Sequence, residues 1–275
     1  MIKLMLDAAS DSIRTQAYDH YIPLNIQIDN KQYKDGVDLD PQIFYTLLST
    51  CKDFPKTSQP SPEDFVPAFE EAKTNGDDII YLCLSSALSG TYQCANVAKQ
   101  LVDYDNIYII DTCAATHMIG MLAQYVNHMR SQGLSAPQIV DKVQQLRQRL
   151  VLYAGLDTLE YLYKGGRLSR TSAAVGSIAN IKPIITVSPN GKVESFAKSI
   201  GIKRAISTIV KNVEADEIDT DFPVWSICTV DTENCDALEA ALAQAGVSIA
   251  ERMQVGSTIG AHVGPGVYGV IYVKK

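Results

Sequence analysis

The feature that most constrains the fold is a short apolar run that leads through a polar turn directly into a helical pattern. Residues 79–84 (IIYLCL) form an apolar segment of strand length, which is typical of a strand buried on both faces of a sheet. After the turn, apolar residues recur at helical spacing as far as Leu101. A strand that turns straight into a helix places the helix's first unpaired N–H groups beside the turn. This region therefore predicts a cradle for an anionic or carbonyl oxygen.

The turn itself, residues 85–90, carries three serines, one glycine and no charged residue. Gly90 permits close backbone approach, and Ser86 and Ser89 add hydroxyl groups, so a neutral oxygen-binding site is expected. Two other interpretations stay open. Ser89 could simply cap the helix, or it could be the nucleophile of a hydrolase. Ala87 stands where the hydrolase elbow has glycine, so the hydrolase signal is weak.

Composition narrows the class of protein. The 275 residues are 46% hydrophobic and 20% charged, which suffices for a large core and two domains. The net charge of −7 argues against nucleic acid as the main partner. No apolar run approaches the roughly 20 residues that span a bilayer, and Asp7 interrupts the first run too early for a signal peptide. The spacing of the six cysteines predicts free thiols in a cytoplasmic protein, with neither metal nor cofactor.

Alternating strand-like and helix-like segments predict an α/β protein of two domains. Residues 1–150 imply a mostly parallel sheet with helices on both faces, whose ligand site lies beyond the carboxyl ends of the strands. Asp7, Ser89 and Asp111 are expected at that edge. Residues 151–275 predict a C-terminal α+β domain with antiparallel pairing, including a hairpin that turns at residues 188–191.

Two further regions hold candidate binding residues. Thr57 and Ser58 lie in a proline-rich stretch just before a helix start, where we expect a loop whose hydroxyls are not used for capping. His262 ends a stretch of small and apolar residues, although a lone histidine is usually structural. Residues 264–269 (GPGVYG) match a dinucleotide-binding pattern but lead into a strand, so a tight turn is expected instead.

Taken together, these motifs resemble the DegV family, the bacterial fatty-acid-binding proteins that partner a fatty acid kinase. The likeness runs along nearly the whole chain and shows in residues 31–38 (KQYKDGVD), 55–61 (PKTSQPS), 84–93 (LSSALSGTYQ), 157–162 (DTLEYL), 164–167 (KGGR), 180–184 (NIKPI) and 260–266 (GAHVGPG). The resemblance implies a two-domain α/β protein that holds a long-chain fatty acid between its domains and performs no chemistry of its own. It places the carboxylate-binding residues at Thr57, Ser89 and His262.

The chain departs from the family pattern at several positions. Ala8 and Ala9 stand where the family's N-terminal turn carries serines, and Val263 replaces a threonine beside the histidine. Ile200 and Ile202 replace arginines around a glycine. Because these hydroxyls and cations are missing, it stays open whether this chain uses a kinase partner. A binding paralogue with an altered partner or lipid choice is the alternative.

The sequence thus predicts a fatty-acid carrier that is not an enzyme. The expected ligand-binding residues are Thr57, Ser58, Ser86, Ser89, Gly90 and His262. The alternatives are a serine hydrolase that uses Ser89 with His262, and an interaction module whose pocket has been lost. The basic residues Lys164, Arg167 and Arg170 are candidates for docking an acidic partner or phosphate, or form a solvated face. Because the assigned cradle contains no arginine, protonated His262 is expected to supply the positive charge for the carboxylate.

Overall fold

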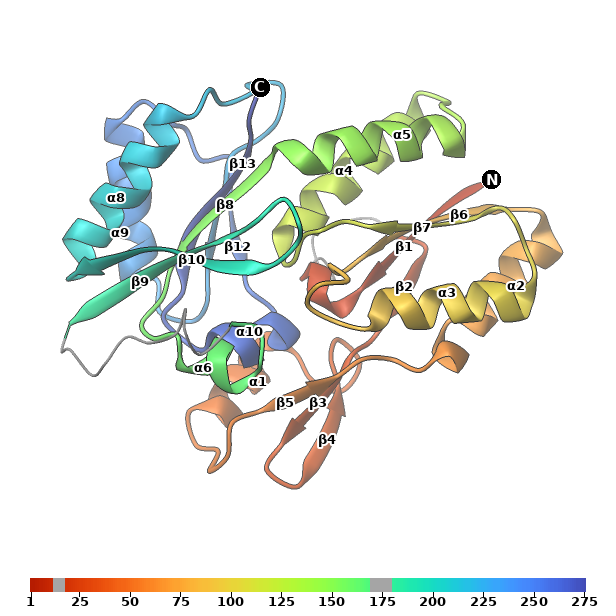
Figure 1. Cartoon of the computed structure of the whole chain (residues 1–275), viewed down its shortest axis with the longest axis horizontal. Coiled ribbons are helices and arrows are strands. Elements are labelled where there is room, and N and C mark those ends of the chain that lie inside the picture. Colours follow the sequence, from red (N-terminus) through yellow and green to blue (C-terminus); the bar gives the residue numbers. More distant parts are fainter. Residues whose placement is uncertain (12–17, 169–179) are drawn as a thin grey trace.

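The computed structural model describes residues 1–11, 18–168 and 180–275 (Figure 1). The N-terminal half is built on a four-stranded parallel sheet in the order β2-β1-β6-β7. Its strands are β1 (Ile2–Asp7), β2 (His20–Ile22), β6 (Asp78–Cys83) and β7 (Ile107–Asp111). The sequence pattern does not predict β2, because three residues are too few to show a period.

Helices cover both faces of this sheet because its buried side chains alternate between two cores. Met5, Ile79 and Tyr81 pack with α2 (Val66–Asn75) and α3 (Thr91–Val102). Leu4, Leu6, Ile80 and Leu82 pack on the other face with α4 (His117–Ser131) and α5 (Ala136–Leu146). The predicted parallel sheet with helices on both faces is confirmed.

The C-terminal half contains a six-stranded sheet in the order β10-β9-β8-β13-β11-β12. Its strands are β8 (Leu150–Gly155), β9 (Ile181–Val187), β10 (Val193–Ile200), β11 (Trp225–Cys228), β12 (Glu251–Gln254) and β13 (Tyr268–Val273). All neighbours pair antiparallel except β11 and β12, and β9 and β10 form the predicted hairpin. The sequence pattern does not predict strand β12. Only Met253 in it is buried, so the strand has no apolar periodicity.

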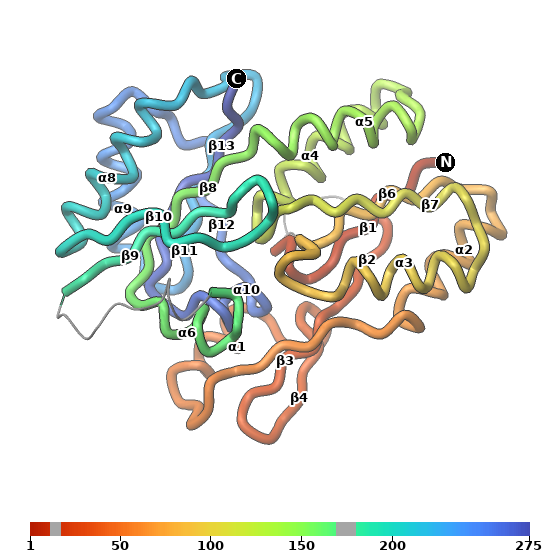
Figure 2. The backbone as a smooth tube through the Cα atoms, in the orientation of Figure 1, coloured from red at the N-terminus to blue at the C-terminus, as the bar shows by residue number. Residues whose placement is uncertain are grey.

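The two faces of the C-terminal sheet have different neighbours. One face packs against α8 (Ile202–Ala215) and α9 (Glu233–Gln244). Leu152, Ile185 and Ile227 on the other face join the same core as α4 and α5 of the N-terminal half. Figure 2 shows the two halves side by side, with β8 and β9 facing the turn after β6. A continuous apolar layer therefore lies between the halves.

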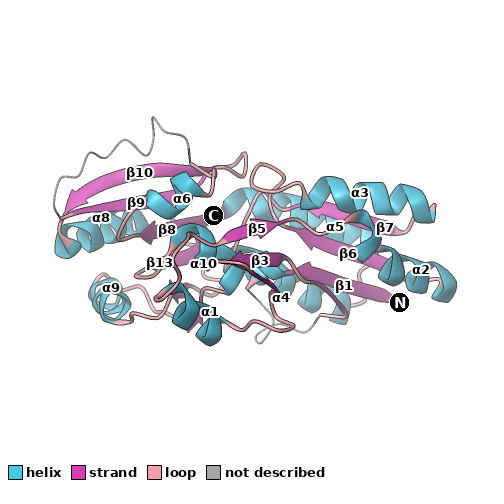
Figure 3. Cartoon of the chain, turned by 90° about the horizontal axis from the view of Figure 1, so that it is seen from below, coloured by secondary structure: helices cyan, strands magenta, loops and turns pink. Residues whose placement is uncertain are grey.

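A third, three-stranded antiparallel sheet, in the order β4-β3-β5, lies across the lower edge of both halves (Figures 1 and 3). It consists of β3 (Asn25–Ile28), β4 (Lys31–Lys34) and β5 (Lys56–Ser58). The expectation that Thr57 and Ser58 lie in a loop is wrong. They pair with Ile26 and Asn25 of β3, and this pairing with a strand some 30 residues away orders the proline-flanked segment.

The remaining helices of the described residues are short. They pack near this small sheet or link larger elements. They are α1 (Pro41–Leu48), α6 (Glu160–Lys164), α10 (Ser257–Val263) and three 3₁₀ turns, η1 (Ala8–Ser10), η2 (Pro62–Asp64) and η3 (Arg147–Arg149). Helix α10 contacts α6, α1, β3 and β5, so it brings His262 against the third sheet. Within the described ranges, no helix has the length and apolar character needed to cross a bilayer.

Candidate ligand-binding site

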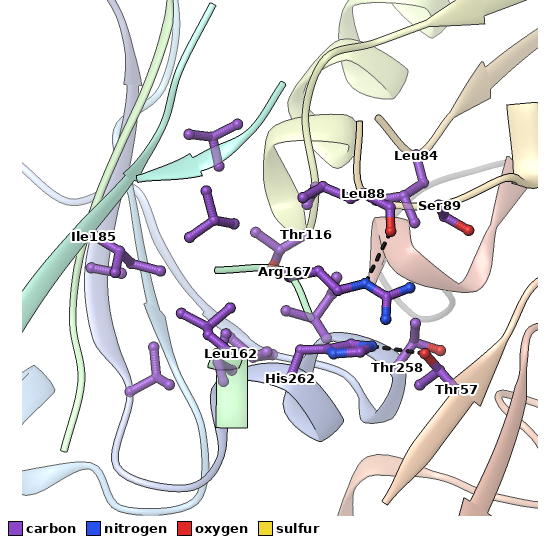
Figure 4. A pocket seen from close by; sticks show the side chains of 18 of the residues that line it. Thr57, Leu84, Leu88, Ser89, Thr116, Leu162, Arg167, Ile185, Thr258 and His262 are labelled. Atoms are coloured by element: carbon purple, nitrogen blue, oxygen red, sulfur yellow. Dashed lines mark hydrogen bonds between the residues drawn. The ribbon is translucent and has the colours of Figure 1, made fainter. Parts of the chain in front are cut away.

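An apolar cavity lies between the two halves of the chain (Figure 4). Its volume is about 800 Å³, including the open space at its mouth. Most of its lining is aliphatic and includes Leu88, Leu152, Ala154, Ile185, Val187 and Ile227. The C-terminal sheet and the turn after β6 thus form a wall that suits an apolar ligand.

Polar groups gather at one end of this cavity, where β5, α10 and the turn before α3 meet (Figure 4). Thr57 Oγ1 lies 2.7 Å from Nε2 of His262. Ser89 also lines the cavity, and its Oγ lies 2.8 Å from Oγ1 of Thr91. The fold therefore brings Thr57, Ser89 and His262 together, although Thr57 and His262 lie 205 residues apart in the sequence.

Ser58, Gln59 and Gly90 complete this end in different ways. Ser58 and Gln59 line the cavity, whereas Gly90 lies just outside it. A Cβ at Gly90 would lie 2.1 Å from Gln59 Oε1, so the absence of a side chain there admits the Gln59 amide. Gln59 was not singled out in the sequence, since its position depends on the pairing of β5 with β3.

The structure places Ser86 away from the cavity. Its Oγ and its N–H both donate hydrogen bonds to the carboxylate of Asp111 at the end of β7. Asp7 acts similarly at the end of β1, where its carboxylate accepts hydrogen bonds from Leu84 N and Tyr81 Oη, at 2.9 and 2.8 Å. Both aspartates lie at the expected edge of the sheet, but they hold the turn in shape and do not face the cavity.

Arg167 lines the polar end of the cavity, although the sequence suggests it only for partner docking. Its Nε donates to Leu88 O at 3.0 Å and its Nη1 to Gly165 O at 2.6 Å. Among the described residues, no carboxylate forms an ion pair with it. Burial lowers the pKa of its guanidinium, which nevertheless stays charged at neutral pH. Among the described residues at this end of the cavity, Arg167 is therefore a cation without an anionic partner.

Lys164, a second member of the basic cluster, lies outside the apolar cavity. Lys164 is exposed, pairs with Glu160 at 2.8 Å and lies 3.7 Å from the ring centre of Phe54. Arg170 falls outside the described residues. After α6 the backbone folds back on itself, with Arg167 N donating to Leu162 O, and this turn directs Arg167 inward. The KGGR sequence shows that the residues are basic but not which of them points inward.

The charge of His262 differs from the expectation. Burial, reinforced by the nearby positive charge of Arg167, lowers the pKa of His262 to about 4. The ring of the ligand-free protein is therefore neutral at neutral pH. The premise that the cradle contains no arginine is wrong, since Arg167 lines it, so a positive charge is present there without protonation of His262. The ring is packed closely, because a Cβ at Gly165 would lie 2.3 Å from its Nδ1.

Comparisons with known proteins agree with this architecture. The family model of DegV, a family described as uncharacterised proteins, matches residues 1–275. A DegV domain-containing protein from Caldanaerobacter subterraneus is 38% identical over 271 residues, which cover 98% of this chain and 96% of the relative. A fatty-acid-binding DegV family protein from Thermus thermophilus superposes with a TM-score of 0.87 at 29% identity, over 100% of this chain and 99% of the other. Another from Streptococcus agalactiae superposes with a TM-score of 0.88 at 25% identity, with the same coverage.

Proposed function

The chain belongs to the DegV family, and we propose that it is a carrier that binds a long-chain fatty acid between its two halves. The observation that carries this proposal is the shape of the cavity, which is aliphatic along its length and polar at one end (Figure 4). A fatty acid has the same division into an apolar tail and one charged head. The open cavity also speaks against an interaction module whose pocket has been lost.

The tail supplies most of the binding free energy. Burying about 14 methylene groups at about 0.8 kcal/mol each gives a gross ~11 kcal/mol before ordering costs. A neutral hydrogen bond to the head contributes only about 1 kcal/mol. The side chains at the polar end therefore serve mainly to orient the carboxylate.

We place the carboxylate among Thr57, Ser89 and Arg167. The Arg167 guanidinium supplies the opposite charge, and its hydrogen bonds to Leu88 and Gly165 fix its position. Neutral His262 can donate its Nε2 hydrogen to Thr57 Oγ1, which leaves the Thr57 hydroxyl hydrogen for the ligand. In this arrangement His262 orients a donor and carries no charge.

The carboxylate end of the cavity adjoins the molecular surface. A depression lined by Lys56, Lys164 and Tyr161 shares Thr57, Arg167 and His262 with the apolar cavity. A bound carboxylate would therefore be accessible from outside, as presentation to a fatty acid kinase requires. We propose this presentation as the role of the carrier, with Lys164 on the side that docks the kinase. We also propose that the protein acts in the cytoplasm, where the six free thiols of the chain would persist.

Among the described residues, no histidine hydrogen-bonds to Ser89, the nucleophile of the serine hydrolase alternative. Nε2 of His262 forms a hydrogen bond with Thr57 Oγ1, and Ser89 Oγ forms one with Thr91 Oγ1. A nucleophilic serine requires a base within hydrogen-bond reach. We therefore propose that the protein is not an enzyme. A fluorophosphonate probe tests this directly: we expect no label on Ser89, and covalent labelling there would contradict the carrier.

Calorimetric titration of the delipidated protein tests the proposed function. A saturated C16 acid should bind with one site per chain, and its methyl ester should bind about tenfold or more weakly because a charge-assisted hydrogen bond is lost. A C8 acid should bind far more weakly than the C16 acid, since it buries fewer methylenes. If neither the C16 acid nor its ester binds, the proposal is wrong.

A further inference from the structure

Helix α10 carries part of the ligand site, but its own sequence does little to hold it in place. Four of its residues line the apolar cavity, namely Thr258, Ile259, His262 and Val263. A helix of seven residues is too short to be stable alone, so its position depends on tertiary contacts. Its N-cap residue is Gly256, which has no side chain to accept a hydrogen bond from the first turn. The N–H groups of that turn therefore depend on acceptors from elsewhere.

Asp35 supplies such an acceptor from 223 residues earlier in the chain. Its Oδ2 accepts hydrogen bonds from Thr258 N at 2.8 Å and from Thr258 Oγ1 at 2.7 Å. The Asp35 side chain is buried, so water competes little for these two bonds. Thr258 is the second residue of α10, and its N–H can find no partner inside the helix. One carboxylate oxygen thus holds the start of α10.

Asp35 is itself fixed to the third sheet. It directly follows β4, and its N–H donates to Leu24 O at 2.9 Å. Its carbonyl oxygen accepts a hydrogen bond from Tyr21 Oη at 3.2 Å. The same sheet carries Thr57, which pairs with Ile26 of β3. Asp35 and Thr57 are therefore held by one small scaffold.

This scaffold holds α10 at two points on one face of the helix. Thr258 and His262 are four residues apart, so their side chains lie on the same face. Asp35 holds Thr258, and Thr57 Oγ1 lies 2.7 Å from Nε2 of His262 (Figure 4). A rod that is fastened at one point can still tilt, whereas two points fix its direction. The packing of α10 on α1 adds apolar contacts, which are not directional.

We propose that Asp35 is a positioning residue of the ligand site. By holding the start of α10 it keeps His262 against Thr57, and so directs the Thr57 hydroxyl towards the carboxylate of the ligand. Asp35 lies outside the apolar cavity, so it acts through the helix and not by contact with the ligand. The last step rests on the proposed function, whereas the effect on His262 can be measured without a ligand.

The ring of His262 reports whether α10 has moved. Burial lowers its pKa to about 4, and solvation would raise the pKa towards the ordinary value of about 6.5. Histidine NMR of the ligand-free protein over about pH 5 to 8 detects this change, and His262→Gln assigns the signal. Asp35→Ala removes both hydrogen bonds and should raise the pKa by about one unit or more. Asp35→Asn keeps an oxygen that can accept both bonds, so its His262 should titrate like the wild type.

The sign of the shift separates position from charge. Loss of a negative charge would lower the pKa of a histidine, in Asp35→Ala and in Asp35→Asn alike. A rise in Asp35→Ala alone therefore comes from the lost hydrogen bonds. The matched control is Asp38→Ala, since Asp38 is an exposed residue of the same loop whose Oδ1 accepts a hydrogen bond from Lys34 N. An equal rise in this control, or no rise in Asp35→Ala, would overturn the proposal.

Calorimetric titration tests the last step. Asp35→Ala should reduce the preference for a C16 acid over its methyl ester about threefold or more, and Asp35→Asn should retain that preference. An unchanged preference beside a raised pKa of His262 would contradict the step from His262 to the carboxylate. If the pKa rises but the wild type binds neither acid nor ester, the carrier proposal is wrong and the positioning of His262 by Asp35 stands.

A milder variant covers the case in which Asp35→Ala does not fold. Thr258→Val keeps the shape of the side chain and removes one of the two hydrogen bonds to Asp35. It should raise the pKa of His262 in the same direction by a smaller amount. A titration of His262 in Thr258→Val that matches the wild type would then overturn the proposal.

Discussion

Among the described residues that line the cavity, Arg167 is the one lysine or arginine, and its charge would distinguish a carboxylate from an uncharged apolar ligand. Arg167→Gln keeps a hydrogen-bond donor but removes the charge. We expect it to weaken binding of a C16 acid about tenfold or more, because charge-assisted hydrogen bonds are worth roughly 1.5–3 kcal/mol. Binding of the methyl ester, measured in the same titration, should hardly change.

The matched control is Arg204→Gln, which removes an exposed arginine of α8 far from the cavity. It should leave the affinities for acid and ester unchanged. If Arg167→Gln weakens acid and ester equally, the arginine supports the structure of the cavity and does not bind the carboxylate.

His262 gives a second prediction at this scale, through pH. Because the pKa of His262 is lowered to about 4, the ring stays neutral throughout the range from about pH 6 to 9. Its charge therefore changes only as pH falls towards 4, where protonation would favour an ionised carboxylate. Fatty-acid affinity should be flat from about pH 6 to 9, and wild type and His262→Gln should give parallel curves. A wild-type affinity that falls through the neutral range, beside a flat curve for His262→Gln, would show a protonated histidine.

The residues of the polar end differ in how far the sequence reveals them. Thr57, Ser89 and His262 stand in recognisable local contexts, and all three line the cavity. Arg167 and Gln59 line it too, but their orientation depends on a backbone turn and on a strand pairing that no local pattern encodes. The charge of His262 could not be predicted either, because it depends on burial and on the approach of Arg167.

At the scale of elements, the turn between β9 and β10 fastens the C-terminal sheet to the N-terminal half. Ser85 Oγ donates to Gly191 O at 2.8 Å, and Val187 and Val193 on either side of the turn line the apolar cavity. Gly191 has a φ of 73°, and a Cβ there would lie 2.0 Å from Ser85 Oγ and 2.9 Å from Cys113 Cα. Any larger residue must therefore push the turn away from Ser85 and Cys113 of the N-terminal half.

Gly191→Ala should lower the free energy of unfolding by about 1–3 kcal/mol more than a glycine replacement without a clash, and it should speed the release of a bound fatty acid. Gly246→Ala is the matched control, since its φ is 81° and nothing lies within 4 Å of the added Cβ. Chemical denaturation and stopped-flow release measure the two effects. Equal losses in the two variants would show that backbone strain alone is responsible.

Elements with a strong local pattern are the ones the sequence predicts. The apolar runs of β6, β7 and β13 and the capped start of α1 at Asp40 and Pro41 are all present. Strands β2, β5 and β12 are three or four residues long, and each exists because a neighbour elsewhere in the chain pairs with it. The addition of β5 to the third sheet was therefore out of reach of local reasoning, although β5 carries Thr57 to the site.

At the scale of the whole molecule, the apolar end of the cavity lies opposite its polar end, so the cavity should limit the length of the acyl chain that it binds. Ile185 lies far from the polar end in Figure 4, and Ala154 pairs with it across β8 and β9. Each added methylene should tighten binding about fourfold, at about 0.8 kcal/mol, until the cavity is full. Ala154→Leu should shift this limit to shorter acids, as a titration series of saturated acids would reveal.

Ala243→Leu places the same side chain on the exposed face of α9 and serves as the control. It should leave the dependence on chain length unchanged. If Ala154→Leu also leaves it unchanged, the tail does not reach β8 and the ligand lies elsewhere.

The central claim, that a fatty acid occupies the space between the two halves, is tested most directly by the ligand that the protein carries from the cell. Organic extraction of the purified protein, followed by mass spectrometry, should recover about one fatty acid per chain. Its length should be roughly C14–C18, which matches the tail used in the burial estimate. Recovery of a stoichiometric nucleotide or sugar phosphate, with no lipid, would contradict the account.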